Sequence, residues 1–289
     1  MLKTLWRPKR NLLSRLINLK NMAAKIHSTA VIHPAARIDT DVEIGPYSVI
    51  GDDTQIGAGT YVGPHCIIEF STIGKNNRFT GAAYIGMPPQ DYSYHGEHTR
   101  FTMGDSNIIR EGVSLHRGSH ATSLTEMGSG CMLMANSHVG HDCRLGNNII
   151  MVNSAAAAGH VHIDDGALIS GLVGIHQFTR IGRFAMLSGG AMANQDIIPY
   201  VIARGDRAKP VGLNLVGMKR NGISGDCIKS IKHVFKTLFF QGLLLTDAIA
   251  RLRAEKLPPE AALILDFCEG SKRGIARPLR TLKELASFK

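Results

Sequence analysis

Two histidines three residues apart, His138 and His141, are followed at once by Asp142 in the stretch MANSHVGHDCRLGNN (residues 134–148). Imidazole and carboxylate groups at such spacing serve two chemistries. They can bind a metal ion, or a histidine can remove a proton while the carboxylate fixes its tautomer. The choice depends on the backbone that carries these residues, because only a helix places residues three apart on one face.

A repeat of six residues runs through most of the chain. Apolar residues recur at this spacing over residues 26–68 and, after a slip of one, over 73–85. The pattern breaks in the loop MPPQDYSYHGEHTRF and resumes over 103–187, with Ala121 at one of the expected positions. Neither a helix nor a single strand has this period. Three short strands per coil do, because every sixth residue then faces inward, with small residues at the bends.

The sequence therefore predicts a parallel β-helix over residues 26–198. At 18 residues per coil and about 4.8 Å between strands, it predicts about nine coils and a prism about 45 Å long. Beyond the hexads, apolar residues over 228–239 follow helical spacing from a capping residue at Ser224. Shorter helices are predicted over 246–252 and 259–265. Residues 199–289 are thus predicted to form a small C-terminal α-helical domain.

The net charge of +10 is concentrated at the N-terminus. Residues 1–25 hold seven Lys and Arg and no acid, so the rest carries 33 − 7 = 26 basic and 23 acidic residues, a net of +3. That balance does not indicate a nucleic-acid surface, and no apolar run approaches the roughly 18 residues of a membrane span. Five scattered cysteines without a CxxC pair favour reduced thiols, and hence a cytoplasmic protein.

Two interpretations of the basic leader, residues 1–25, stay open. It is acid-free and rich in Arg and Leu, as are transit peptides and membrane-surface helices. It equally fits a non-functional extension upstream of a start at Met22. Because the hexads begin only after Met22, residues 1–21 are expected to be dispensable for folding and catalysis.

On a β-helix, residues 18 apart lie one above another on successive coils. Gly159 is therefore expected over His141, and His160 over Asp142. One coil further, Gln177 lies over Gly159, next to His176 in sequence. His116, in the run LHRGS, lies in the coils below. Such a polar column serves no packing purpose, because buried polar groups need partners.

Three interpretations of this column remain open at this point. It can be a solvated face without function. It can be a zinc site made by His138, His141 and His160, as in trimeric hexapeptide carbonic anhydrases. It can also be an acid–base site, in which His141 removes a proton, Asp142 fixes the imidazole tautomer, and the N–H of Gly159 stabilises an oxyanion.

The motifs on this scaffold resemble those of the UDP-N-acetylglucosamine O-acyltransferases, which carry out the first step of lipid A synthesis. The resemblance covers residues 26 to about 222 and continues more loosely through the C-terminal helices. It is carried by the motifs MPPQDYSYHGEHTR, LHRGS, SHVGHDC, AGHVHIDD, GIHQF, IPYVIARGD and GLNLVGMKRNGIS. It implies a left-handed β-helix, although crossovers are usually right-handed, and a homotrimer with active sites between neighbouring prisms.

The resemblance also implies roles for individual residues. His141 matches the catalytic base, Asp142 its partner acid, and Gly159 the glycine that stabilises the oxyanion. Gly190 matches the glycine that limits acyl-chain length. The other positions that match substrate-binding residues of the family are Asp91, His138, His160, His176, Gln177, Asn214 and Arg220.

The activity implied is transfer of a 3-hydroxyacyl group from acyl carrier protein to the 3-position of UDP-N-acetylglucosamine. No metal and no cofactor are implied beyond the carrier's phosphopantetheine. Ser93, Val216 and Asn221 stand where the family pattern has a lysine, an acid and a second arginine. These departures leave open a 3-amino sugar as acceptor, and the acyl-chain length is also open. A related hexapeptide N-acyltransferase and the zinc carbonic anhydrase are the alternatives.

Overall fold

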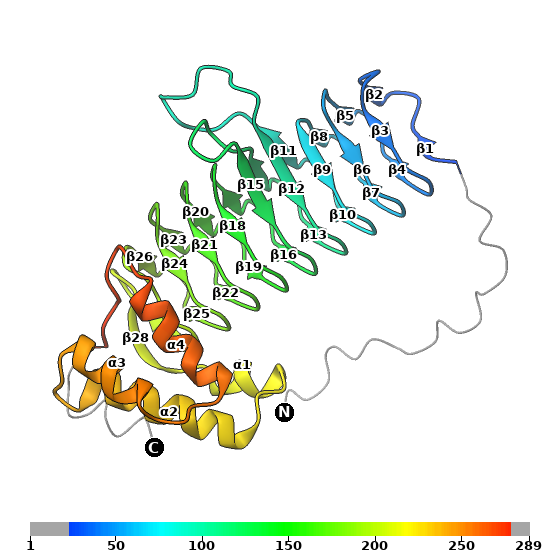
Figure 1. Ribbon diagram of the computed structural model, residues 1–289. Helices are drawn as coiled ribbons and strands as arrows, with labels where there is room; N and C mark the ends of the chain where they lie inside the picture. The colour runs from blue at the N-terminus through cyan, green and yellow to red at the C-terminus, as the bar shows by residue number, and fades with distance from the viewer. Residues whose placement is uncertain (1–22, 279–289) are drawn as a thin grey trace, which may run out of the picture.

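The structure of the protein is a computed structural model, which describes residues 23–278. The expectation for residues 1–21 therefore lies outside the described residues. Stacked coils form a long prism, with helices at its C-terminal end (Figure 1). Each hexad supplies a two-residue strand and a corner. In β4 (Glu43–Ile44) the first residue is exposed and the second is buried. Each strand pairs in parallel with the strand one coil later, as Ile44 does with Val62.

Within residues 23–278 the strands form three sheets, named here A, B and C. Sheet A contains eleven strands: β1 (Lys25–Ile26), β4 (Glu43–Ile44), β7 (Tyr61–Val62), β10 (Arg78–Phe79), β13 (Ile108–Ile109), β16 (Met132–Leu133), β19 (Ile150–Met151), β22 (Leu168–Ile169), β25 (Met186–Leu187), β27 (Val201–Arg204) and β28 (Lys209–Leu213). Sheet B contains nine strands: β2 (Val31–Ile32), β5 (Val49–Ile50), β8 (Ile67–Ile68), β11 (Tyr84–Met87), β14 (Ser114–His116), β17 (His138–Val139), β20 (Ala156–Ala157), β23 (Gly174–Ile175) and β26 (Met192–Ala193). Sheet C contains eight strands: β3 (Arg37–Ile38), β6 (Gln55–Ile56), β9 (Ser71–Ile73), β12 (Arg100–Met103), β15 (Leu124–Met127), β18 (Arg144–Leu145), β21 (His162–Ile163) and β24 (Arg180–Ile181).

The eight strands of sheet C close eight complete coils. A ninth coil ends in a single parallel bridge between Ile181 and Ile197. The prediction of a β-helix of about nine coils is confirmed, and the helix is left-handed. The inward residues of the hexads form one aliphatic column whose central members, such as Ile50 and Ile109, are fully buried.

The corners bend through residues in the left-handed region of backbone space. At the corner between sheets B and C, Asp142, His160 and Phe178 have φ of 59°, 60° and 64°. They lie 18 residues apart, so this conformation repeats on three successive coils. Side chains at these positions consequently lie one after another along the corner. At this corner the line carries an acid, an imidazole and an aromatic ring.

One predicted inward position is wrong. Ala121 is exposed, and Met103 pairs with Met127, 24 residues later, where a regular coil would give 18. The extra hexad leaves the prism as a loop over residues 117–123. A longer loop, residues 88–99, projects between β11 and β12 (Figure 1). Both loops interrupt the prism between sheets B and C.

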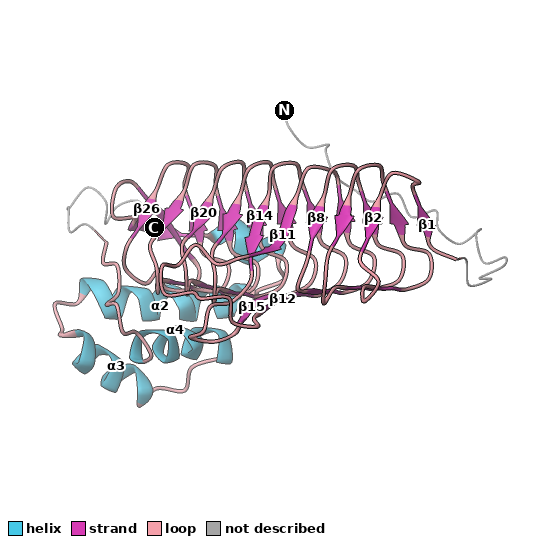
Figure 2. Cartoon of the chain, turned by 90° about the horizontal axis from the view of Figure 1, so that it is seen from above, coloured by secondary structure: helices cyan, strands magenta, loops and turns pink. Residues whose placement is uncertain are grey.

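The C-terminal region begins with an extension of sheet A past the predicted boundary at residue 198. β27 continues the parallel ladder beside β25, and β28 returns antiparallel to it. The helices follow as α1 (Leu215–Arg220), α2 (Gly225–Phe240), α3 (Leu245–Arg253) and α4 (Pro259–Glu269). They lie beside one end of the prism (Figure 2). Within residues 23–278, no helix has the length and apolar character needed to cross a membrane.

The three predicted helices are present as α2, α3 and α4. The hydroxyl of Ser224 caps α2 as predicted, accepting the N–H of Cys227 at 3.2 Å. The sequence does not predict β27, β28 and α1, because these short elements carry neither the hexad nor an extended helical period. After α4 the chain returns to the prism, where Ile275 bridges to Asp196.

Candidate active site

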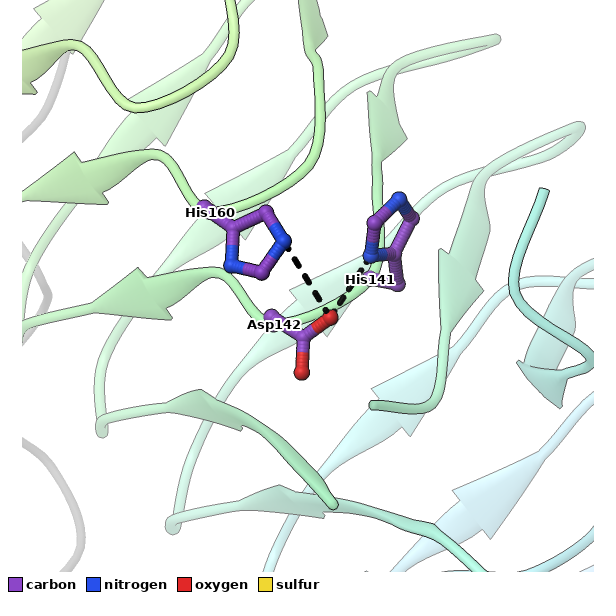
Figure 3. A group of neighbouring side chains, drawn as sticks. All are labelled: His141, Asp142 and His160. Carbon is purple, nitrogen blue, oxygen red and sulfur yellow. Dashed lines mark hydrogen bonds and ion pairs between the residues drawn. The ribbon is translucent and has the colours of Figure 1, made fainter. Parts of the chain in front are cut away.

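The corner between sheets B and C brings together His141, Asp142 and His160 (Figure 3). Nδ1 of His141 lies 2.6 Å from Oδ2 of Asp142. Nε2 of His160, one coil further along, lies 3.7 Å from the same oxygen. The Asp142 side chain is completely buried, whereas 13% of His141 and 20% of His160 is exposed. A buried carboxylate thus supports two imidazoles that reach the surface.

Asp142 is held by donors from the loop over residues 117–123. The N–H of Ser119 donates to both carboxylate oxygens at 3.1 Å, and the N–H of Thr122 donates to Oδ1 at 3.2 Å. The hydroxyl of Thr122 donates to Oδ1 as well. Burial by itself raises the pKa of Asp142, but the hydrogen bonds from His141, Thr122 and Ser119 outweigh it and hold the pKa well below its usual value. Asp142 is therefore ionised at any pH near neutrality.

An ionised Asp142 determines the tautomer of His141. Because the carboxylate is an acceptor, Nδ1 of His141 carries the proton and donates a hydrogen bond to Oδ2. Nε2 is then left with its lone pair. This nitrogen faces Gly159, since a Cβ built on Gly159 would lie 2.6 Å from it. The arrangement suits a base that takes a proton at Nε2.

The backbone N–H of Gly159 has no hydrogen-bond acceptor among residues 23–278. Gly159 itself is buried. The coil below presents Gly140 to this nitrogen, where a Cβ would come within 2.9 Å of it, so no side chain of residue 140 covers it. Unpaired buried N–H groups are rare in folded proteins. One placed beside the basic nitrogen of a histidine is a donor available to a developing oxyanion.

His138 lies on the other side of His141 and makes different contacts. Its Nδ1 is 2.8 Å from the hydroxyl of Ser114, and its ring meets that of His116 edge-on at 5.1 Å. His116 in turn donates from Nδ1 to the carbonyl of Pro88, at 2.6 Å. Burial, followed by the charges of His116 and His141, lowers the pKa of His138 to about 4. His138 is consequently neutral at physiological pH.

The buried histidine makes stability depend on pH. The pKa of His138 is about 4 in the folded protein, against 6.5 without its environment. Between these values the unfolded chain binds a proton that the folded chain does not, so acid favours unfolding. We expect the free energy of unfolding to fall as the pH drops from 6.5 to 4, by up to about 3 kcal/mol from this group.

His138→Gln keeps a hydrogen-bonding partner for Ser114 but cannot titrate, so its thermal midpoint should fall less steeply with acid. The exposed His27 is the matched control, and His27→Gln should follow the wild-type curve. If His138→Gln and wild type lose the same number of degrees between pH 7 and pH 4.5, His138 is not the titrating group.

The geometry does not favour the zinc alternative with His138, His141 and His160 as ligands. The potential ligand atoms that lie within 4.8 Å of one another belong to His141, Asp142 and His160, and His138 is not among them. The Asp142 oxygens already accept hydrogen bonds from Ser119, Thr122 and His141. A zinc ion bound here would displace these donors from a buried carboxylate, which is costly.

The loop over residues 88–99 places Asp91 near this corner. The charge of His141 contributes to lowering the pKa of Asp91, after the larger effect of the hydrogen bonds from Ser93. The N–H and the hydroxyl of Ser93 both donate to Oδ1 of Asp91, at 2.9 and 2.8 Å. Ser93, one of the departures from the family pattern, thus fixes the orientation of the Asp91 carboxylate.

Arg117 anchors the same loop to the prism. Its guanidinium is almost fully buried and donates to the carbonyl of Gly86 at 2.7 Å and to Glu69 at 3.0 Å. It also donates to the hydroxyl of Tyr94 at 3.2 Å and lies over the ring of Phe70 at 4.3 Å. Together with the bond between His116 and Pro88, this contact fixes the loop on both sides of Asp91.

A cavity of about 550 Å³ opens from His141 across sheet B. His138, Gly159, His176 and Gln177 are among its lining residues, so the structure brings these predicted site residues together. Beyond them its surface consists mainly of small or apolar side chains on or next to β20, β23 and β26: Ala156, Ala158, Gly174, Ile175, Met192 and Ala193. An apolar surface reaching from a histidine–aspartate pair can accommodate an aliphatic chain.

Six predicted site residues do not line this cavity. Asp91, Asp142 and His160 lie around the corner as described above, and Gly190, Asn214 and Arg220 lie elsewhere. Gly190 occupies an exposed corner with φ of +70°, two residues before Met192. Asn214 caps α1, where its Oδ1 accepts the N–H of Gly217 at 2.9 Å, and its Nδ2 donates to the carbonyl of Phe184. Arg220 is exposed at the end of the same helix.

The two remaining departures from the family pattern also belong to α1. Val216 is 59% exposed, and Asn221 ends the helix by donating from Nδ2 to the carbonyl of Gly217 at 2.9 Å. Neither lines the cavity beside His141.

Several residues around the corner were not predicted from the sequence. Ser119 and Thr122 donate to Asp142, and the ring of Phe178 stacks on His160 at 4.5 Å. Gln90 and Asn194 line the cavity. The 18-residue spacing from Asp142 through His160 to Phe178 was a usable signal for Phe178. The donors to Asp142 had none, because they come from a loop.

Comparisons with known proteins agree with the fold and identify the family. Residues 196–276 match the family model described as UDP-N-acetylglucosamine O-acyltransferase, domain 2. The acyl-[acyl-carrier-protein]–UDP-N-acetylglucosamine O-acyltransferase of Janthinobacterium sp. (strain Marseille) is 46% identical over 259 residues, covering 87% of this chain and 99% of the relative. Its counterpart from Myxococcus xanthus (strain DK1622) is 49% identical over 257 residues, covering 88% and 100%. The crystal structure of the Francisella novicida UDP-N-acetylglucosamine acyltransferase superimposes with a TM-score of 0.86 at 37% identity, covering 91% of this chain and 97% of that one. The chain therefore belongs to the UDP-N-acetylglucosamine O-acyltransferase family.

Proposed function

We propose that this protein transfers a 3-hydroxyacyl chain from acyl carrier protein to the 3-hydroxyl of UDP-N-acetylglucosamine, the first step of lipid A synthesis, with His141 as general base. The observation that supports these roles is the unpaired N–H of Gly159 beside the free Nε2 of His141. A base and an oxyanion donor on adjacent coils are the two groups that acyl transfer to a hydroxyl requires.

In the proposed reaction, Nε2 of His141 takes the proton of the acceptor hydroxyl as its oxygen attacks the thioester carbonyl. The new C–O bond gives a tetrahedral intermediate, whose oxyanion accepts the N–H of Gly159. Asp142 stabilises the imidazolium through Nδ1. Collapse of the intermediate breaks the C–S bond, and the departing phosphopantetheine sulfur receives the proton from His141. No metal or further cofactor enters this reaction.

The cavity on sheet B supports an assignment as the acyl site, because its small and apolar side chains begin at His141 and Gly159. Asn214 and Arg220 do not line it. Their position supports a homotrimer in which residues from a neighbouring prism complete each site. All five cysteines are buried and unpaired, which agrees with a reducing compartment, and we place the reaction in the cytoplasm.

The proposal is tested by offering the purified protein a panel of hydroxyacyl carriers with UDP-N-acetylglucosamine or its 3-amino analogue. Mass spectrometry then identifies the product. We expect an ester of UDP-N-acetylglucosamine, formed equally well after treatment with a chelator. An amide product alone would identify the amino sugar as acceptor. Activity that chelation abolishes and zinc restores would replace the general-base assignment by a metal site.

We predict that Gly190 sets the length of the acyl chain. The residues 18 and 36 positions earlier, Leu172 and Ser154, have φ of 60° and 59°, so side chains are accommodated at this corner. A Cβ on Gly190 would meet nothing within 4 Å. Gly190→Met can therefore extend toward Met192 at the end of the cavity, and it should shift the preference to shorter donors, since overfilling costs about 1–3 kcal/mol.

Gly190→Ala is the matched control, because it introduces the same backbone strain without a side chain long enough to reach the cavity. The ratio of kcat/KM between long and short donors should change in Gly190→Met and not in Gly190→Ala. An unchanged ratio in both variants would remove Gly190 from the acyl site.

A further inference from the structure

A second groove, of about 660 Å³, lies on the opposite side of the same corner, on sheet C. Asp142 and His160 are among its lining residues, so it opens directly onto the site around His141. Strands β18, β21 and β24 contribute to its floor. Lys272 and Arg273, from the segment that follows α4, line it as well. The segment that follows α4, drawn in red in Figure 1, lies next to the prism.

The floor of the groove carries a ladder of basic residues. Arg144 pairs in register with His162, and His162 pairs with Arg180. Side chains at these positions therefore lie side by side on one face of sheet C. Burial, followed by the charges of Arg144 and Arg180, lowers the pKa of His162. His162 is thus neutral, and its two neighbours supply the charge of the ladder.

The groove carries a net positive charge. Four cations line it, Arg144, Arg180, Lys272 and Arg273, against the two acids Asp142 and Asp196. Both acids are turned toward protein donors. Those of Asp142 are described above, and Asp196 accepts the N–H of Arg180 at 2.9 Å and the hydroxyl of Ser271 at 2.8 Å. Four cations against two acids leave a net charge of 4 − 2 = +2 with the histidines neutral.

The four cations are not equivalent. Arg180 holds the C-terminal region against the prism, donating to the carbonyl of Phe267 at 3.2 Å and lying 4.1 Å over its ring. Arg273 donates from Nε to the carbonyl of Asn194 at 3.1 Å. Arg144 is 61% exposed, and its ion pair with Glu126 is long, at 3.7 Å. Lys272 is also exposed. Arg144 and Lys272 are therefore the cations that can move to a ligand.

We propose that this groove binds a phosphate group of a substrate, with Arg144 and Lys272 as the residues that contact it. The inference rests on the proposed function, in which both substrates carry phosphate: the diphosphate of the nucleotide sugar and the phosphodiester of the carrier's arm. Guanidinium and ammonium groups on two walls of a groove match the charge and the acceptor oxygens of a phosphate. The phosphate would lie on sheet C while the acyl chain occupies sheet B, with His141 between them.

The test is the double variant Arg144→Gln, Lys272→Gln. Its control is Arg37→Gln, Lys75→Gln, which removes the same charge from exposed positions on the distant coils. Calorimetry measures the affinity of each protein for UDP and for pantetheine 4′-phosphate, with uridine and pantetheine as ligands that lack phosphate. We expect the groove variant to lose about 10-fold or more in affinity for one of the two phosphate ligands, while the control matches wild type. The ligand affected identifies the substrate whose phosphate is bound, and the KM of that substrate should rise with kcat little changed.

Equal affinities of wild type and the groove variant for both phosphate ligands, or no binding of either ligand by wild type, would overturn the proposal. The binding measurement needs no turnover. If wild type transferred no acyl group but bound one phosphate ligand more tightly than the groove variant, the groove would stand and the proposed function would fall.

Discussion

Replacing His141 by alanine is expected to lower the rate of acyl transfer by a factor on the order of 10²–10⁴, the usual contribution of a general base. The imidazole is hydrogen-bonded to a buried, ionised Asp142, which leaves Nε2 free to take the proton of the acceptor. His141 projects at a corner, outside the aliphatic column. The β-helix should therefore remain folded, and the loss should appear in kcat with saturating substrates.

The matched control is His138→Ala, which removes an imidazole three residues away that contacts Ser114 and not Asp142. It should cost less than His141→Ala, because His138 has no carboxylate partner to support an imidazolium. Circular dichroism and thermal unfolding check that both variants are folded. Full activity of a folded His141→Ala variant, or a larger loss in His138→Ala, would show that the base is another group.

The sequence was sufficient to predict the prism because its period is set by local geometry. Each hexad must provide one inward aliphatic residue, and this requirement repeats in every coil wherever the chain follows the prism. Residues one coil apart therefore stack in a predictable order. Gly159 was placed over His141, and His160 over Asp142, by spacing alone, and both neighbours are found in the structure. The handedness came from the family resemblance, since the spacing is the same for either hand.

The six-residue period did not predict the structure where the chain leaves the prism. Ala121 continues the six-residue count but lies in a loop, and that loop supplies Ser119 and Thr122 as donors to Asp142. A regular coil in this place would leave the buried carboxylate without these partners. The six-residue count therefore could not predict these donors, because Ala121 fits the repeat although the chain leaves the prism at this point.

The roles of Asn214 and Arg220 could not be tested in the same way. Both belong to α1, a helix too short to show a period, and within one chain neither lines the cavity beside His141. A contribution from a neighbouring prism depends on the arrangement of chains, which the spacing of residues along one chain does not determine. The sequence thus predicts the contacts in the site between residues of successive coils of one chain.

Adding a single methyl group at Gly159 is expected to reduce turnover by about 100-fold or more. A Cβ at this position would lie 2.6 Å from both Cε1 and Nε2 of His141, closer than atoms can approach. The ring cannot move away easily, because Nδ1 is bound to Asp142 at 2.6 Å. Displacing a catalytic group by about 1 Å can cost on the order of 100-fold, and the methyl group also obstructs the N–H that would meet the oxyanion. Gly159 has no left-handed φ, so alanine strains the site and not the backbone.

Gly171→Ala is the matched control, because its Cβ would meet no atom closer than 3.4 Å, at another corner of the prism. It should leave kcat unchanged, and both variants should unfold near the wild-type temperature. The double variant His141→Ala, Gly159→Ala decides the mechanism. If the methyl group acts by displacing the His141 imidazole, it has nothing to displace in a protein that lacks this ring. The double variant should then be little slower than His141→Ala alone. Losses that multiply in full would show that Gly159 acts independently of His141, through its N–H or through the substrate.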